Sequence, residues 1–202
     1  MEPASTRRNS FQRGEPLAKI FGSPARLKTI RFFVFNKSQT FTLTEIAQKT
    51  KLSNDVAHRE LSDLISSDLV RKKGTGVPVH YQTNHNFEHL DALDLFIRDT
   101  TNVRPKSLIT SLRRAGVLRL VVLSGFFMGV LESQIDLLVV GDRLEEKVLA
   151  AVVRSLEAEL GREIRYASFI TEDFRYRLGV YDRLLRDVFD YPHRLLVDKI
   201  GI

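Results

Sequence analysis

The stretch 42-TLTEIAQKTKLSNDVAHRELSDLI-65 limits the folds open to this chain more than any other segment. Thr42 and Glu45 form a capping-box pattern, which predicts a short helix over residues 43–50. A short turn follows, and Ser53 can cap a second helix whose apolar residues face inward. Two short helices joined by such a turn predict a helix-turn-helix unit.

The flanking segments add a third helix and a hairpin to this unit. Upstream, Ser23-Pro24 is typical of a helix start, and apolar residues recur at helical spacing over residues 27–34. Downstream, two β-prone runs within residues 69–84 lie on either side of 73-KGTG-76, which predicts a hairpin with basic residues at its tip. The expected order is therefore helix, helix, turn, helix and basic hairpin.

Positive charge is concentrated in this half of the chain. Residues 1–85 contain 14 Lys and Arg against 7 Asp and Glu, whereas the remainder contains 17 against 18. An excess of positive charge confined to one part predicts an anionic partner for it, and nucleic acid is the commonest such partner. A basic surface that is merely solvated is the alternative interpretation.

The second helix of the pair carries the candidate base-contacting residues. Its apolar stripe, which we expect to face the core, consists of Val56, Leu61, Leu64 and Ile65. The opposite face then presents polar side chains that can reach base edges or phosphates in a major groove. These are Asn54, His58, Arg59 and Ser62. Asp55 and Asp63 lie on the same side and favour the alternative of a solvated helix face.

Basic residues on both sides of the helix pair are candidates for contact with the DNA backbone or the minor groove. In the predicted hairpin they are Arg71, Lys72 and Lys73. Residues 1–16 are polar, contain two prolines and carry few apolar side chains, so they predict a flexible basic arm. Its candidate contact residues are Arg7, Arg8 and Arg13.

Residues 20–84 resemble the winged-helix domains of the arsenical-resistance-repressor family and related bacterial and archaeal regulators. The resemblance is carried by Leu43-Thr44-Glu45-Ile46-Ala47, Leu52-Ser53, Leu61 with Leu64, and Asp68-Leu69-Val70. It implies a winged-helix domain over residues 17–85 that binds double-stranded DNA, and a homodimer that reads paired half-sites. Because many winged helices bind proteins instead of DNA, a protein-docking role is the alternative.

Histidines near the end of this domain raise the question of a metal sensor, because relatives of the fold sense metals. His85 and His89 stand four residues apart at the start of an expected helix, with His80 and Asp91 nearby. Such a pair can hold zinc if a third ligand joins it. No residue in the sequence identifies that third ligand, so we expect surface histidines and no metal site.

Residues 86–116 are predicted to form a helical linker before a second domain at residues 117–202. The linker contains two expected helices, Phe87–Asp99 and Lys106–Ala115. The first has an apolar stripe with no obvious partner inside the winged helix, so it could bridge the domains or form a dimer interface. The stripe consists of Leu90, Leu93, Phe96 and Ile97.

The second domain shows alternating strand and helix patterns. Val117–Leu123 and Ile135–Val140 are continuous apolar runs, as expected of strands buried on both faces. Arg143–Leu160 is an amphipathic helix, Ile164–Ile170 is a third strand, and a final helical region extends to Asp190. This order predicts a small α/β unit with a mostly buried sheet.

The segment 117–190 resembles the minimal nucleotidyltransferase domains of the DNA polymerase beta superfamily. The resemblance is carried by Leu123–Gly141 and by the later Thr171-Glu-Asp-Phe-Arg-x-Arg-Leu. That family has a strand ending in Gly-Ser, a short helix, a strand with Asp-x-Asp, and a third acid on the next strand. The carboxylates hold two magnesium ions, which clamp a nucleoside triphosphate and activate the attacking oxygen.

Key positions of that motif are altered in this chain. Gly125 matches the family glycine, but Phe126 stands in place of the serine that would touch phosphate. Asp136 matches the second acid of Asp-x-Asp, whereas the first falls on Gln134. The third strand contains no acid, and its Arg165 would oppose a metal ion. One acid of three cannot hold the metals, so we expect an inactive domain without a cofactor.

Together these patterns predict an α+β protein with an N-terminal winged helix-turn-helix followed by a small α/β nucleotidyltransferase-like domain. We expect a DNA-binding transcriptional regulator whose second domain serves oligomerisation, sensing of a nucleotide, or binding of a protein. The alternative is an active magnesium-dependent nucleotidyltransferase that uses the winged helix for docking. Its metal ligands would be Glu132, Asp136 and Asp142. Without cysteine, a secretory signal or a membrane-length apolar run, a cytoplasmic protein is expected.

Overall fold

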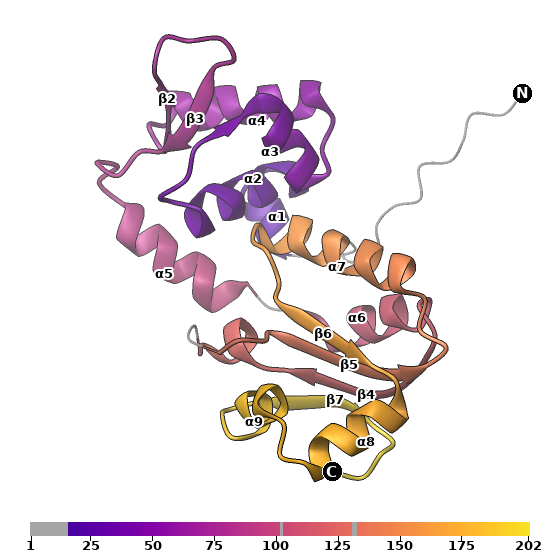
Figure 1. Ribbon diagram of the computed structural model, residues 1–202. Helices are drawn as coiled ribbons and strands as arrows, with labels where there is room; N and C mark the ends of the chain where they lie inside the picture. The colour runs from indigo at the N-terminus through magenta and orange to yellow at the C-terminus, as the bar shows by residue number, and fades with distance from the viewer. Residues whose placement is uncertain (1–15, 102, 131–132) are drawn as a thin grey trace, which may run out of the picture. The chain divides into compact units, whose positions relative to one another are not determined.

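The computed structural model describes residues 16–101, 103–130 and 133–202. These residues form two units of mixed helix and strand, each with its own sheet (Figure 1). Of the described residues, 16–101 and 155–162 belong to unit 1, and the others belong to unit 2. The arginines expected in the basic arm, Arg7, Arg8 and Arg13, lie outside the described residues.

Unit 1 contains the helices α1 (Pro16–Ile20), α2 (Pro24–Phe35), α3 (Leu43–Thr50), α4 (Asn54–Ser66) and α5 (Leu90–Thr100). Its strands β1 (Phe41–Thr42), β2 (Val70–Lys73) and β3 (His80–Thr83) pair antiparallel in the order β1-β3-β2. The predicted capping box of α3 is confirmed. The Thr42 hydroxyl accepts from the Glu45 N–H at 3.3 Å, and the Glu45 carboxylate accepts from the Thr42 N–H at 2.7 Å.

The core of unit 1 lies where α2, α3 and α4 meet, with Leu27, Ile46 and Leu61 almost completely buried. The apolar stripe of residues 90–97 had no obvious partner inside the winged helix when judged from the sequence, and the structure corrects this expectation. Leu90 and Ile97 of α5 are buried in this same core. Residues 86–116 are thus divided between the two units, because α5 belongs to unit 1 and the next helix belongs to unit 2.

Unit 2 contains a four-stranded sheet in the order β6-β5-β4-β7, in which only the β5–β6 pair is parallel. Its strands are β4 (Val117–Leu123), β5 (Leu137–Asp142), β6 (Tyr166–Phe169) and β7 (Arg194–Asp198). Its helices are α6 (Pro105–Leu112), the 3₁₀ helix η2 (Gly125–Met128), α7 (Glu146–Leu160), α8 (Thr171–Gly179) and α9 (Arg183–Phe189). From Ser155 onward, α7 belongs to unit 1.

The two central strands, β4 and β5, are buried on both faces, as their continuous apolar sequences predicted. Helices α8 and α9 cover one face (Figure 1), where Phe174 and Leu185 pack against Leu120 and Leu138. On the opposite face of the pleat, Val139 is completely buried as well. Double burial explains why these strands show no apolar–polar alternation.

The sequence analysis missed the strand β7. A helical region was expected up to Asp190 and nothing was predicted after it, yet residues 194–198 pair antiparallel with β4. The run Leu195–Val197 is short, and β7 is half exposed, so its sequence has neither the length nor the burial pattern of the central strands. Its pairing partner lies far away in the sequence, and a local pattern cannot reveal such a partner.

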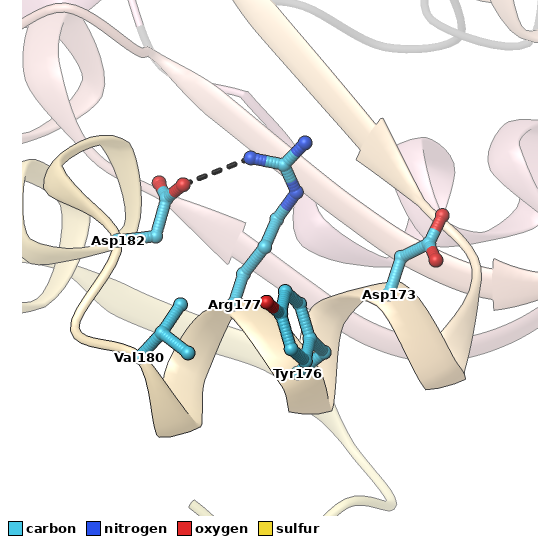
Figure 2. Close-up of a pocket in the computed structure, with 5 residues that line it drawn as sticks. All are labelled: Asp173, Tyr176, Arg177, Val180 and Asp182. Atoms are coloured by element: carbon cyan, nitrogen blue, oxygen red, sulfur yellow. Dashed lines mark hydrogen bonds and ion pairs between the residues drawn. The ribbon is translucent and has the colours of Figure 1, made fainter.

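Helices α8 and α9 meet at a tight corner held by a salt bridge. Arg177 of α8 donates to Asp182 at 2.8 Å, and Asp182 caps α9 by accepting from the Leu184 N–H at 2.9 Å (Figure 2). The Arg177 guanidinium also lies 4.9 Å from the centre of the Phe169 ring. Among the helices of the described ranges, none has the length and apolar character needed to cross a membrane.

Replacing Thr42 with alanine should loosen the start of α3 without disturbing the rest of unit 1. The substitution removes the hydroxyl that accepts from the Glu45 N–H, and loss of such a cap costs about 1 kcal/mol. Hydrogen exchange should show the opening free energy of the α3 amides lowered by about that amount. Ser38→Ala, at an exposed position just before β1, is the control. Equal losses in the two variants would contradict the role of the cap.

Candidate nucleic-acid interface and carboxylate site

The four candidate base-contacting residues lie on one exposed face of α4. Asn54, His58 and Ser62 are spaced four residues apart, which aligns them along the helix, and Arg59 lies beside His58. All four side chains are exposed, whereas Leu61 on the opposite face is buried. Within the described part of the chain, no acidic side chain forms a salt bridge with Arg59. Its guanidinium is therefore available to a ligand.

Arg26 of α2 binds two acidic side chains of α4. Its Nε donates to Glu60 and its Nη2 donates to Asp63, while the Ser23 hydroxyl donates to Glu60 at 3.1 Å. The hydrogen bond with Glu60 raises the pKa of Arg26. These contacts hold α4 against α2, and they neutralise Asp63, which the sequence analysis counted against DNA binding.

The sequence analysis did not single out Arg26 or Glu60. One signal was present, because Glu60 follows Val56 at the helical spacing that places a side chain on the inner edge of α4. Glu60 is only 6% exposed. A buried acid at such a position requires a cation, but the sequence could not say that the cation comes from α2.

The basic residues of the hairpin lie on β2, where Arg71, Lys72 and Lys73 are all exposed. With the Gln82 amide oriented to satisfy both groups, its oxygen accepts from Arg71 Nε at 2.8 Å and from Nη2 at 3.0 Å. Arg71 is thereby partly held by β3. For Lys72 and Lys73, the described residues supply no salt-bridge partner, so their ammonium groups remain open to phosphate.

The histidines considered for a metal site do not gather around one point. His80 is on β3, and His89 occupies the N-cap position of α5. Throughout the described ranges, no three His, Asp or Glu side chains are grouped so that they could hold a metal ion.

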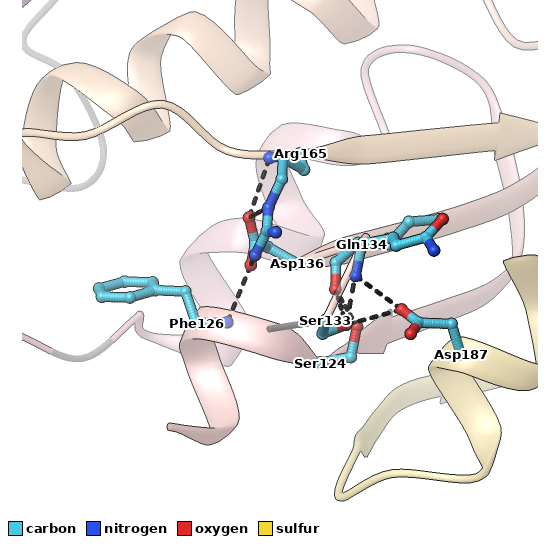
Figure 3. A network of polar contacts seen from close by, with 8 residues as sticks. Ser124, Phe126, Ser133, Gln134, Asp136, Arg165 and Asp187 are labelled. Atoms are coloured by element: carbon cyan, nitrogen blue, oxygen red, sulfur yellow. Dashed lines mark hydrogen bonds and ion pairs between the residues drawn. The ribbon is translucent and has the colours of Figure 1, made fainter. Parts of the chain in front are cut away.

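In unit 2, the carboxylate of Asp136 is completely buried and makes four hydrogen bonds (Figure 3). Oδ1 accepts from the Phe126 N–H at 2.8 Å and from Arg165 Nη2 at 2.8 Å. Oδ2 accepts from the Arg165 N–H and from Arg165 Nε, both at 3.0 Å. The carboxylate is thus held between η2 and the residues that precede β6.

Burial of Asp136 disfavours its charged form, but the hydrogen bonds outweigh that effect. The Arg165 guanidinium and the backbone N–H groups of Phe126 and Arg165 together lower the pKa of Asp136. Gly125 makes the close approach possible. Its φ is +50°, and a Cβ there would collide with the Asp136 carboxylate and lie 2.7 Å from the Ile135 carbonyl oxygen.

The position of the expected first acid is also changed. The Gln134 side chain is exposed, and its backbone N–H donates to Asp187 of α9 at 2.7 Å. The Ser133 hydroxyl donates to the same carboxylate at 3.0 Å (Figure 3). Asp187 therefore anchors the backbone before β5, a role that the sequence analysis did not anticipate.

The acids proposed for an active transferase do not converge. Asp136 and Asp142 lie at opposite ends of β5, which separates them by about 20 Å. Asp142 is engaged by Arg119 Nε at 2.7 Å and by the Thr171 hydroxyl at 2.6 Å. One magnesium ion needs ligands within about 2.1 Å of itself, so these two cannot share it. Glu132, the third residue of that proposal, lies outside the described residues.

No family model, curated protein or solved structure matches the chain. The residues and geometry of the two sites therefore carry the functional conclusion alone. Unit 1 presents an exposed polar helix face beside a basic strand. Unit 2 presents a buried carboxylate whose acceptor positions are taken by a guanidinium and by backbone N–H groups.

Replacing Asp136 with asparagine should destabilise unit 2 by about 3 kcal/mol at pH 7, because the amide cannot accept all four hydrogen bonds. The lowered pKa means that ionised Asp136 stabilises the fold above its unfolded value of about 4. That stabilisation is lost as pH falls through the folded value. The difference between wild type and variant should therefore shrink at low pH.

Urea unfolding followed by tyrosine fluorescence measures this effect, because four of the five tyrosines lie in unit 2. The control is Asp173→Asn, which removes a carboxylate from an exposed position of α8. A difference between wild type and Asp136→Asn that stays constant from pH 7 to pH 3 would contradict the proposed role of the charge.

Proposed function

We propose that the chain is a sequence-specific DNA-binding transcriptional regulator, and that unit 1 is a winged helix that reads double-stranded DNA. The observation that carries this proposal is the exposed face of α4, with Arg59 available on it, beside the basic strand β2. An α-helix fits the major groove, and residues near the start of a recognition helix are the ones that reach base edges.

The roles of the side chains follow from their chemistry. Arg59 can donate two hydrogen bonds to guanine, and Asn54 can pair with adenine. His58 and Ser62 contact bases or phosphates further along α4. Lys72 and Lys73 bind phosphates through charge alone, so their contribution is independent of base sequence. Arg71, held by Gln82, positions the hairpin as well as contributing charge.

Neutralisation of α4 by Arg26 supports this assignment. Without Arg26, the acids of α4 would outnumber its single arginine and repel a phosphate backbone. With Glu60 and Asp63 bound to Arg26, only Asp55 remains as an unmatched acid near the start of the helix. A carboxylate at that position can accept from the amino group of cytosine.

We propose that unit 2 has a nucleotidyltransferase-like fold without transferase activity. Three features support this: β4 ends two residues before Gly125, the short helix η2 begins at that glycine, and β5 begins directly after Asp136. The bonds from Arg165 occupy the one acid of the motif that remains. We therefore assign to unit 2 a role in oligomerisation, sensing or partner binding, and no catalytic step.

Incubation with a labelled nucleoside triphosphate and magnesium should give no transfer of label to protein, RNA or DNA. Asp136 is already bound by Arg165, and a metal ion would have to displace that guanidinium. The measurement is label transfer by the full chain beside Asp136→Ala. Magnesium-dependent transfer by the full chain would contradict this assignment and favour the competing function, a transferase that docks through unit 1.

Selection from a random library of DNA duplexes should enrich one preferred, two-fold symmetric site. Arg59→Ala should weaken binding to that site by about 10- to 100-fold and weaken binding to a scrambled duplex much less. Lys72→Ala should weaken both about equally and reduce the dependence of affinity on salt. Affinities measured at two salt concentrations separate these effects.

The matched control is Lys147→Ala, which removes one exposed positive charge from α7 in unit 2. It should leave both affinities unchanged. Binding of wild type that salt abolishes equally for all duplexes would contradict sequence-specific regulation. Equal losses for Arg59→Ala and Lys72→Ala on the selected site would contradict the division of roles between α4 and β2.

A further inference from the structure

The corner between α8 and α9 exposes large apolar side chains close together. Tyr176 is 72% exposed and Tyr181 is 81% exposed, and Leu178 and Val180 lie between them in the sequence with 38% and 55% exposure. These four residues are here termed the corner patch. Exposed clusters of this kind mark interaction surfaces, because a monomer gains nothing by holding them in water.

Residues of the corner patch take part in lining two hollows, and Asp182 lines both of them. The first, of about 340 Å³, is lined by Asp173, Tyr176, Arg177, Val180 and Asp182 (Figure 2). The second, of about 280 Å³, is lined in part by Leu178, Tyr181, Leu185 and Phe189. Protruding tyrosines and hollows large enough for a side chain therefore occur on one continuous surface. That combination can be complementary to itself.

The charges around the corner patch are balanced in number, and four of them form two salt bridges. Residues 170–195 contain five acids and five arginines. Arg177 pairs with Asp182 at 2.8 Å, and Arg186 pairs with Asp190 at 3.3 Å. A surface with net charge would repel an identical surface, whereas this one would not. Tyrosine and arginine are also the residues most enriched where subunits bind each other.

We propose that the corner patch is the surface through which two copies of this chain associate about a two-fold axis. In such an interface the same patch lies on both copies, so Tyr176 and Tyr181 of each can enter the hollows of the other. The choice of a second copy as occupant rests in part on the proposed function, because a two-fold symmetric DNA site requires paired reading domains.

The competing surface is on α5 in unit 1. Leu95 is 62% exposed and Phe96 is 41% exposed. Phe96 already contacts Phe21, with the ring centres 6.2 Å apart. The corner patch therefore offers more free aromatic surface than α5 does, and Leu95 supplies a control position of matched character.

Sedimentation equilibrium of the full chain without DNA tests the proposal. Wild type should dimerise, and Tyr176→Glu and Tyr181→Glu should each raise the dimer dissociation constant about 30-fold or more. Leu95→Glu should leave it unchanged. Both tyrosines are exposed, so circular dichroism and the thermal midpoint should match wild type. Two independent variants guard against a local folding defect in either one.

Three results would overturn the proposal: a wild type that stays monomeric, in which case the corner patch serves another protein; a dimer that both tyrosine variants retain; or a dimer lost only in Leu95→Glu. None of these depends on DNA. In parallel, affinity for a half-site should be the same in wild type and Tyr181→Glu, while affinity for the full site should fall in the variant. Failure of wild type to bind any duplex would count against the proposed function and leave the dimer result standing.

Discussion

The buried carboxylate of Asp136 is the interaction on which the architecture of unit 2 depends. It ties three segments together: η2 through the Phe126 N–H, the start of β5 through its own backbone, and the approach to β6 through Arg165. A side chain at position 125 would collide with the Asp136 carboxylate, so the position of the acid depends on the glycine. The acid can be buried in its charged form because the Arg165 guanidinium supplies the compensating charge.

Unit 1 depends on a different charge arrangement. Its exposed helix α4 carries three acids, and Arg26 from α2 neutralises two of them while holding the helix in place. The Arg26 side chain thus both fixes the orientation of α4 and offsets the negative charge of α4. In the proposed DNA complex, α4 can therefore retain Glu60 as a buried anchor, because the charge of Glu60 is not presented to the ligand.

Features encoded by neighbouring residues could be predicted from the sequence, and features that join distant residues could not. The caps at Thr42 and Ser53 placed α3 and α4 correctly, and the apolar run 117–123 placed β4, because caps and burial leave local patterns. At the candidate site, the neutral side chain at position 134 could be read directly from the sequence. That Arg165 would bind Asp136, that Arg26 would bind Glu60, and that β7 would pair with β4 depends on contacts between residues far apart in the chain. The periodicity of apolar residues along a short segment carries no information about such contacts.

The pairing of β4 with β7 also fixes the order in which the two edges of β4 can be paired during synthesis of the chain. One side of β4 pairs with β5 soon after both have been made, but its other side waits for residues 194–198. At ordinary rates of translation that interval lasts roughly 3 to 10 seconds. During it, a strand that is apolar except for Arg119 presents an open edge, which is the kind of surface that recruits other nascent chains. Until residues 194–198 have been made, β4 is therefore a segment of unit 2 that is open to association with another chain.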